Sequence, residues 1–466
     1  MADKTTELLN ERYRTLTETP IPKLITKLAV PTIISMLVTN IYNTADTFFV
    51  GRISTQATAA VGLVFSVMSI IQALGFLCGQ GSGNFVSRRL GAGNKKEADE
   101  MAVTGFALAV VIGLMVTVLG LIFLNPLARF VGATDTTMED TVSYMRIILI
   151  GAPFMMSQLV INNQLRFQGS AVYAMAGLVS GAVLNIGLDP LLIFVFKMGV
   201  SGAALATVIS QCVAFTILFI GSRKGANIRL KFSNIRFNRK YLLAILNGGS
   251  PSLARQGLAS ISAILLNTAA GRLGGDAGIA GMAVVTRIMM LLISSLIGFG
   301  QGYQPVCSFN YGAKKYDRVR EGFFFCFKVG TMLLTVIAIV IEIFAPQVVA
   351  FFRDDPDVVK VGISALRWQA AALPLTAFTV VSNMMLQSMG KGIQASITAS
   401  ARNGICFIPL ILILPRLFGM QGVEMTQAMA DVLALFIAIP LAVRELRLMK
   451  KESLLMKAGE GPAGAE

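Results

Sequence analysis

Long stretches without a charged side chain most strongly limit how this 466-residue chain can fold. Charged residues make up 14% of the sequence, whereas a soluble domain carries about 25%. A helix needs about 20 mostly apolar residues to cross the hydrocarbon core of a bilayer. Six uncharged stretches reach or approach that length: Ile53–Ser87, Met101–Ala128, Ile147–Leu165, Val200–Ser222, Ile288–Ala313 and Trp368–Gly390. The pattern predicts an all-α polytopic membrane protein, although the length alone suggests two or three soluble domains.

Apolar stretches that contain one charged residue add further spans and bring the expected number to twelve transmembrane helices. An even number of spans places both ends of the chain on the same side of the membrane. The expected spans are about 28–50, 56–84, 101–124, 142–165, 171–195, 200–221, 243–270, 278–305, 322–345, 359–386, 393–415 and 422–443.

The placement of charge predicts the orientation. The formal net charge is +15, and basic residues cluster in every second gap between spans, near positions 88–96, 223–240, 314–320 and 444–457. Two of the alternate gaps are acidic, around 135–140 and 354–357. Because Lys and Arg hold a segment on the cytoplasmic side, we expect both termini in the cytoplasm, with the protein in the bacterial cytoplasmic (inner) membrane. The basic surface then faces anionic lipid head groups and not nucleic acid.

Cysteine and histidine usage excludes several kinds of site. The chain has five cysteines, all within or at the edge of apolar spans, and no histidine. An odd number of cysteines in such positions indicates small core residues, without a disulfide framework or a structural metal site. The first 27 residues are polar and show no cleavable signal pattern, so the first span is expected to act as an uncleaved insertion signal.

An internal repeat divides the chain into two halves. Pro31 and Pro251 lie 220 residues apart, and Gly79-Gln80-Gly81 recurs as Gly300-Gln301-Gly302 at nearly the same offset. With six spans in each half, both halves begin in the cytoplasm, so the repeat is parallel, an arrangement found in secondary transporters. We therefore expect two pseudo-symmetric six-helix bundles. These are an N-lobe (residues 1–221), a basic cytoplasmic linker (222–241), and a C-lobe (242–466) with a basic C-terminal tail.

Two carboxylates lie inside N-lobe spans. Asp46 is the one acidic residue of the apolar stretch Pro31–Gly62. Asp46 and Asp189 each lie about 18 residues into their spans, roughly 27 Å along a helix from the cytoplasmic side. Thr207 reaches a similar depth from the other side. Asn185 precedes Asp189 by four residues, as Tyr42 precedes Asp46, so the members of each pair share one helix face.

The chemistry of these side chains permits two coupling ions. A carboxylate in hydrocarbon costs ~2.5 kcal/mol or more, so both acids should face the bundle interior or a wet cavity. Two buried acids close together cannot both ionise freely, which makes a proton available near neutral pH. Carboxylate, amide and hydroxyl oxygens also suit a hard cation such as Na⁺. The alternative is a structural role, in which each aspartate hydrogen-bonds a neighbouring helix.

The C-lobe provides an internal comparison. The repeat offset pairs Asp46 with Leu266 and Asp189 with Leu410, so the acids serve a function that belongs to the N-lobe alone. Other charges lie inside C-lobe spans, among them Arg287, Arg402 and Asp431. Arg402 and Asp431 are expected to pair with each other, and a structural role is favoured for all three.

Several motifs together resemble the MATE (multidrug and toxic compound extrusion) transporters over nearly the whole chain. They are the proline-initiated first span that ends NTADTFFVG, the pattern GQG…GA, NIGLDP in the fifth span, GVSGAALAT at the start of the sixth, and TRIMMLLISSLIGFGQGYQPVCSFNYGAKKYDRV in the second half. The resemblance implies a V-shaped arrangement of two six-helix bundles. It also implies cation-coupled export of amphiphilic, often cationic, compounds.

The DinF-like branch of that family offers the best match for the site. Its N-lobe cation site matches Asp46, Asn185, Asp189 and Thr207, with Tyr42 as a supporting tyrosine. Its first-helix proline, associated with bending of that helix, matches Pro31. The NorM-like branch instead carries acids on the seventh and tenth helices, where this chain has none, so no second cation site is carried over.

The resulting hypothesis is antiport by a monomer, without a resident cofactor or an enzymatic activity. An inward-moving H⁺ or Na⁺ binds at Asp46 and Asp189, displaces the substrate, and lets the first helix bend at Pro31. Two alternatives are a flippase of lipid-linked saccharides from the same superfamily and, more remotely, a membrane-embedded transferase that uses the acidic run Asp354–Asp357. Flippases of that kind more often have about fourteen spans, and the acidic run is better explained as a helix-breaking turn.

Overall fold

The computed structural model describes residues 2–225, 227–353 and 355–458, and most of them are helical. Within these residues, eleven helices are long and apolar enough to cross a membrane. One of them, α9 (Arg239–Gly312), contains two of the expected spans, joined where Gly275 adopts φ 57° and ψ −149°. A left-handed φ of this kind is readily available to glycine. The prediction of twelve spans is therefore confirmed.

The helices are longer than the uncharged stretches because their charged end turns extend beyond the apolar core. The six N-lobe spans are α2 (Ile21–Gly51), α3 (Thr55–Gly91), α4 (Lys95–Ile122), α6 (Met138–Phe167), α7 (Ala171–Pro190) continued by a π-helix η1 (Leu191–Val195), and α8 (Gly199–Ser222). After α9 come α10 (Tyr316–Phe352), α11 (Pro356–Ser388), α12 (Gly392–Ser400), a π-helix η3 (Ala401–Ile405), α13 (Phe407–Phe418) and α14 (Met420–Lys457). Three elements were not predicted: α1 (Ala2–Glu18), the short α5 (Leu124–Phe130), and the 3₁₀ turn η2 (Phe232–Asn234).

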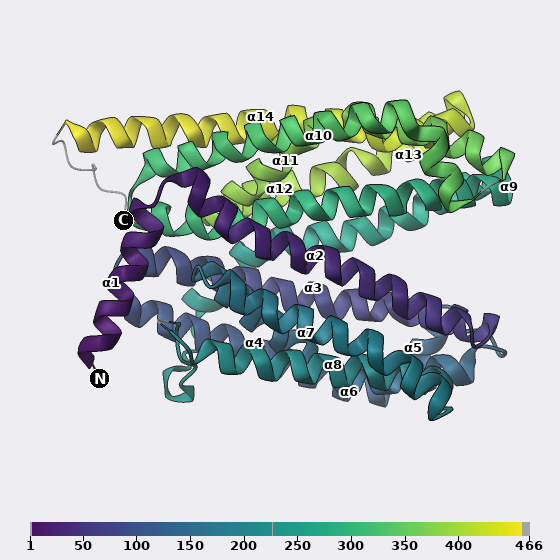
Figure 1. The fold of residues 1–466 in the computed structure, drawn as a ribbon, viewed down its shortest axis with the longest axis horizontal. Coiled ribbons are helices and arrows are strands. Elements are labelled where there is room, and N and C mark those ends of the chain that lie inside the picture. The colour runs from purple at the N-terminus through teal and green to yellow at the C-terminus, as the bar shows by residue number, and fades with distance from the viewer. Residues whose placement is uncertain (1, 226, 354, 459–466) are drawn as a thin grey trace.

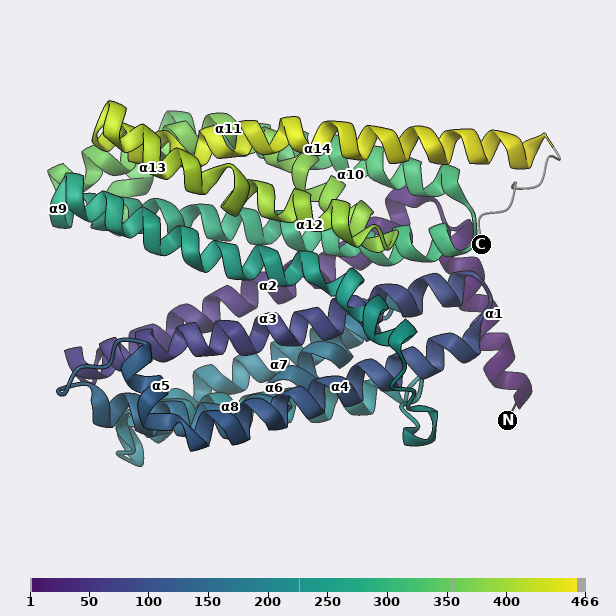
Figure 2. The same ribbon diagram turned by 180° about the vertical axis from the view of Figure 1, so that it is seen from behind.

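The helices form two bundles, α3–α8 in one and α9–α14 in the other, and α2 runs diagonally between them (Figures 1 and 2). The bundles converge near α1 and diverge toward the opposite end of the molecule. Each has its own apolar core. One core extends from Val50 to Leu218 and the other from Ala270 to Ala434. The expected V-shaped pair of bundles is confirmed.

Helix α2 contacts both bundles. Its first half, including Leu24 and Leu28, is buried in a cluster with Tyr303 of α9 and Phe323 of α10. Its last buried residue, Val50, belongs to the core of the other bundle. Helix α2 is helical through Pro31 without a break. A single helix therefore connects the C-lobe helices to the outer part of the N-lobe.

Helix α1 lies across the converging end of the two bundles (Figure 1). Arg12 donates hydrogen bonds to Asn227 Oδ1 (2.8 Å) and to Ser170 Oγ (3.2 Å), which belong to the N-lobe side. Burial lowers the pKa of Arg12 to about 10, so the side chain stays charged at neutral pH. The carbonyl of Leu16 accepts a hydrogen bond from Asn310 Nδ2 of α9 (3.0 Å). The segment before α2 thus also touches both bundles.

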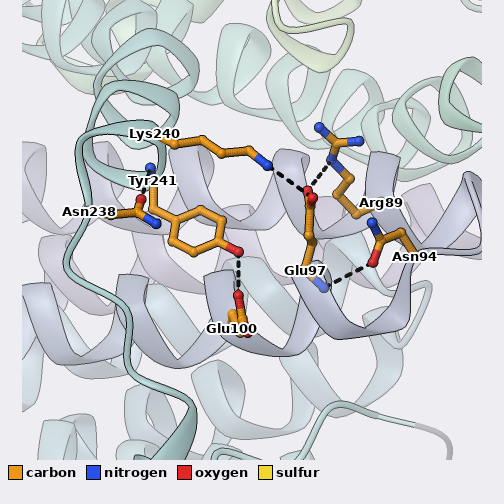
Figure 3. Close-up of polar contacts among 7 residues, drawn as sticks. All are labelled: Arg89, Asn94, Glu97, Glu100, Asn238, Lys240 and Tyr241. Carbon is orange, nitrogen blue, oxygen red and sulfur yellow. Dashed lines mark hydrogen bonds and ion pairs between the residues drawn. The ribbon is translucent and has the colours of Figure 1, made fainter.

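The linker between the bundles is held against α4. Figure 3 shows Glu97 at the start of α4 between two cations, Arg89 (3.0 Å) and Lys240 (2.9 Å). Nearby, the Tyr241 hydroxyl donates to Glu100 (2.6 Å). Because α9 begins at Arg239, the last residues of the expected linker are helical. These partly exposed ion pairs stabilise the protein by about 0–1 kcal/mol each, so they orient the linker more than they hold the fold together.

The acidic run near residue 355 begins a helix. Asp355 Oδ1 accepts hydrogen bonds from the backbone N–H groups of Asp357 (3.0 Å) and Val358 (3.3 Å), which makes Asp355 the N-cap of α11. Asp354, the first residue of the run, lies outside the described residues. The arrangement agrees with the interpretation of this run as a turn between helices.

Close contact between the bundles is possible where α9 lacks a side chain. Helix α3 packs along α9, and a Cβ placed on Gly249 would overlap the backbone carbonyl of Leu77 in α3. Because a backbone carbonyl cannot move aside as a side chain can, any larger residue at position 249 must separate the two helices.

We expect Gly249→Val to lower the free energy of unfolding by about 1–3 kcal/mol, because overpacking here pushes two helix backbones apart. The measurement is the thermal unfolding midpoint of the purified protein in detergent. Gly257→Val is the matched control, since a Cβ on Gly257 of the same helix would meet no atom within 4 Å. Equal midpoints for the two variants would contradict the prediction.

Candidate cation-binding site

The centre of the candidate site is the last turn of α7. Asp189 is fully buried, and Asn185, one turn earlier, is 2% exposed. The Asn185 amide Nδ2 lies 3.5 Å from Asp189 Oδ1, a long contact at the limit of a hydrogen bond. Asp189 Oδ2 and Asn185 Oδ1 are buried without a hydrogen-bond partner among the described residues. The pair therefore presents acceptor oxygens that its own lobe does not satisfy.

The local backbone explains why the acid lies at a helix end. Pro190 directly follows Asp189 and has no N–H to donate to the preceding turn. The α-helix ends there and continues as the π-helix η1. A π-helical turn is wider than an α-helical one and often marks a functional position. The helix type therefore changes directly after Pro190.

Asp46 approaches the same site from α2. Helix α2 packs against α7, and Asp46 lies within electrostatic range of Asp189. Its Oδ1 is buried and has no hydrogen-bond partner among the described residues. The hydroxyl of Tyr42, one turn earlier on α2, lies within electrostatic range of both aspartates. Two helices that are distant in sequence thus bring both acids and this tyrosine together.

Tyr144, a residue that the sequence analysis did not identify, lies near Thr207 and the two aspartates. Thr207 of α8 is 3% exposed. The hydroxyl of Tyr144, on α6, is directed at the Thr207 side chain without completing a hydrogen bond of good geometry, and it also lies within electrostatic range of Asp46 and Asp189. A buried tyrosine in an apolar span is indistinguishable from a packing residue in sequence. The repeat offers one signal, because its counterpart at the 221-residue offset is Ala365.

The arrangement is suited to a small cation. A buried acceptor without a partner costs about 1–3 kcal/mol, and more when it is charged. Four such oxygens belong to the site residues, namely Asp46 Oδ1, Asn185 Oδ1, Asp189 Oδ2 and the Tyr144 hydroxyl. A proton shared with a carboxylate or a Na⁺ held by several oxygens relieves that cost. Within the part of the chain that the structure describes, no cluster of three or more His, Cys, Asp or Glu could hold a metal ion.

The equivalent region of the C-lobe is apolar. Leu266 and Leu410, the repeat counterparts of the two aspartates, both pack against the C-lobe core. The ion pair expected between Arg402 and Asp431 forms elsewhere in this lobe. Arg402 Nε lies 2.7 Å from Asp431 Oδ1, and Arg402 Nη2 lies 3.3 Å from Asp431 Oδ2. This prediction is confirmed. Arg287 has an exposed side chain and is not part of that pair.

Comparison with known proteins identifies relatives along the whole chain. A family model described as MatE matches residues 31–191 and again residues 251–413, so the two matches begin 220 residues apart. Multidrug export protein MepA from Staphylococcus haemolyticus (strain JCSC1435) is 26% identical over 443 residues, which cover 94% of this chain and 97% of that protein. MepA from Staphylococcus aureus (strain MSSA476) is 28% identical over 432 residues, or 91% and 93% of the two chains.

Solved structures agree with the fold. A MATE protein crystallised in complex with MaL6 superposes with a TM-score of 0.89 at 30% identity, over 94% of this chain and 99% of that one. A MOP superfamily transporter from Pyrococcus furiosus, described as having a binding pocket of reverse polarity, superposes with a TM-score of 0.87 at 29% identity, over 94% and 98%. The twice-matching family model and the two-bundle fold establish that the chain belongs to the MatE family, the multidrug and toxic compound extrusion (MATE) transporters.

Proposed function

We propose that this transporter exports small amphiphilic organic compounds, mostly cationic, in exchange for H⁺ or Na⁺ that moves inward. The names of the staphylococcal relatives, multidrug export proteins, support this class of substrate. We assign the chain to the DinF-like branch of the family, whose cation-site residues match those of the N-lobe. The protein acts as a monomer in the bacterial cytoplasmic membrane, surrounded by lipid and with both termini in the cytoplasm.

The observation that supports the proposal best is the set of unsatisfied oxygens around Asp46 and Asp189. In this proposal, the coupling ion binds to Asp46, Asn185, Asp189 and Thr207, with Tyr42 in support. Two negative charges in a low-dielectric interior repel each other, and a proton or a Na⁺ between them removes that repulsion. An occupied site therefore favours a different packing of α2 against α7 than an empty one does. A ligand shifts a conformational equilibrium in this way only by binding one state more tightly than the other.

Helix α2 transmits the change between the lobes. Asp46 lies near its outer end, and the first half of the helix packs against Tyr303 and Phe323 of the C-lobe. Pro31, between these two regions, removes one backbone hydrogen bond and makes bending there less costly than elsewhere in the helix. We assign the hinge to Pro31. Bending at this residue moves the outer half of α2 while its first half stays attached to α9 and α10.

The first test neutralises the acids one at a time. We expect Asp46→Asn and Asp189→Asn each to reduce gradient-driven export of a cationic dye from proteoliposomes by at least tenfold, because neither retains the pair of carboxylates that binds the coupling ion. Asp276→Asn is the control, since Asp276 is exposed near the break in α9. Export is measured in parallel with an imposed pH gradient and an imposed Na⁺ gradient, and the gradient that drives the wild-type protein identifies the ion.

Unimpaired export by both variants, at the same amount of reconstituted protein, would overturn the proposal. A wild-type protein that exports no dye under either gradient would contradict it as well.

The same repulsion predicts an effect on stability. We expect Asp46→Asn to raise the thermal unfolding midpoint above that of the wild-type protein at pH 8 without Na⁺, because one of two buried negative charges is removed. The difference should shrink at acidic pH, where protonation neutralises the wild-type pair. Scanning calorimetry at the two pH values makes the comparison. A difference that does not change with pH would show that the pair does not control stability.

A further inference from the structure

A partly open cavity of about 260 Å³ lies in the C-lobe, between α9, α11, α12 and η3. Most of the exposed lining surface is apolar, with Met290, Ile293, Ile297 and Val380 among the lining residues, and two arginines, Arg255 and Arg402, lie at the wall. An engineered cavity of about 150 Å³ accommodates benzene, so this one has room for an aromatic ring with a short chain. The cavity is separate from the N-lobe site, because every residue that lines it belongs to the C-lobe.

The charge of Arg255 is not balanced within the described residues. Its Nη1 donates to Asn383 Oδ1 at 3.4 Å, which is longer than a normal N–H···O bond. Asn383 is held in this orientation, because its Nδ2 donates to the Ala395 carbonyl (2.6 Å). No carboxylate of the described residues forms an ion pair with Arg255 or acts on it electrostatically. A partly buried cation with one weak neutral partner is costly, and an anion beside it would lower that cost.

The charged residues near Arg255 do not offset its positive charge. Arg402 also lines the cavity, but Asp431 neutralises it through two contacts. Arg166 of α6 lies within electrostatic range of Arg255. It is 2% exposed and donates to two neutral acceptors, Asn163 Oδ1 (2.7 Å) and Gln301 Oε1. The field around Arg255 is therefore positive.

A second polar group in the cavity also lacks a partner. Thr379 of α11 lines the cavity and is 6% exposed, and its hydroxyl is buried without a hydrogen-bond partner among the described residues. A hydroxyl can donate to an anion that a guanidinium already binds. Arg255 and Thr379 thus provide two kinds of donor for one small anionic group in a cavity whose exposed lining surface is mostly apolar.

We propose that this cavity binds the carboxylate end of a small amphiphilic acid, with the carboxylate against Arg255 and Thr379 and the apolar body against Met290, Ile293 and Ile297. A carboxylate carries one negative charge and matches the one guanidinium that lines the cavity without an ion-pair partner, that of Arg255. A phosphate monoester carries about −1.5 to −2 near neutral pH and would exceed it. In this proposal the C-lobe cavity prefers anions, whereas the N-lobe aspartates bind a cation.

The test measures binding by the purified full-length protein in detergent at pH 7.5. The probes are 4-phenylbutyrate, the neutral 4-phenylbutyramide and the cationic 4-phenylbutylamine, which share one apolar body. Isothermal titration calorimetry should show that the wild-type protein binds the acid at least tenfold more tightly than the amide or the amine. Equal affinity for acid and amide, or no binding of the acid, would overturn the proposal without the use of any variant.

Two substitutions locate the site. Arg255→Gln should weaken binding of the acid at least tenfold and change binding of the amide less than twofold. Arg272→Gln, which removes an exposed arginine from the same helix, should bind both the acid and the amide with wild-type affinity. Thr379→Val keeps the shape of the side chain and should weaken binding of the acid severalfold. This variant locates the site even if Arg255→Gln does not fold. Retained preference for the acid in folded Arg255→Gln would place the binding elsewhere and overturn the proposal.

This binding assay uses no ion gradient, so its result is independent of the proposed antiport. Arg146→Gln, which removes an exposed arginine from α6 of the N-lobe, should bind 4-phenylbutyrate with wild-type affinity. A loss of acid binding in Arg146→Gln equal to that in Arg255→Gln would contradict the assignment to the C-lobe cavity.

Discussion

Electrostatic repulsion between Asp46 and Asp189 is the interaction on which the proposed mechanism of this transporter depends. The two acids come from helices α2 and α7 and share an interior that supplies few hydrogen bonds to them. In water this repulsion would be weak, but in a protein interior it is several times stronger. A chain that keeps two such groups together carries a cost that only a bound cation relieves. This is why we assign the acids a role in coupling and not in helix packing.

The path of α2 gives that local interaction an effect on both lobes. The first half of α2 packs with α9 and α10, whereas its outer end packs with the N-lobe. Helix α1 and the turn after it also contact both bundles through Arg12 and the Leu16 carbonyl. A parallel repeat would by itself give two equivalent bundles. The packing of α1 and α2 makes the two bundles unequal. Through α2, the proposed ion site of the N-lobe is connected to helices α9 and α10 of the C-lobe.

The two lobes also differ in their buried charge. The N-lobe buries two acids without a basic partner, and its counterpart positions in the C-lobe are Leu266 and Leu410. The C-lobe instead pairs Asp431 with Arg402 and leaves Arg255 with a weak neutral partner. The groups without an ion-pair partner therefore differ in sign between the two sites, with carboxylates at the N-lobe site and the Arg255 guanidinium at the C-lobe cavity. A substrate with an apolar body and a charged end would meet different chemistry in each.

Much of the architecture followed from the sequence, because membrane insertion imposes strict local rules. Each span must be apolar and must satisfy its own backbone hydrogen bonds, so the number of spans is visible in the sequence. The repeat and the depth of Asp46, Asp189 and Thr207 followed from counting residues along helices. The pairing of Arg402 with Asp431 followed from the high cost of isolated charges in an apolar span.

Other features were decided by the tertiary structure alone. Tyr144 and Arg255 look like ordinary packing or surface residues in sequence, and the partners described for them on other helices lie more than forty residues away. Which face of a helix meets which partner depends on packing over the whole bundle, and no local pattern encodes it. The sequence therefore determined the spans, the repeat and the lobe that carries the acids. Helix packing decided which side chains surround those acids, where the C-lobe cavity lies, and that α2 connects the two lobes.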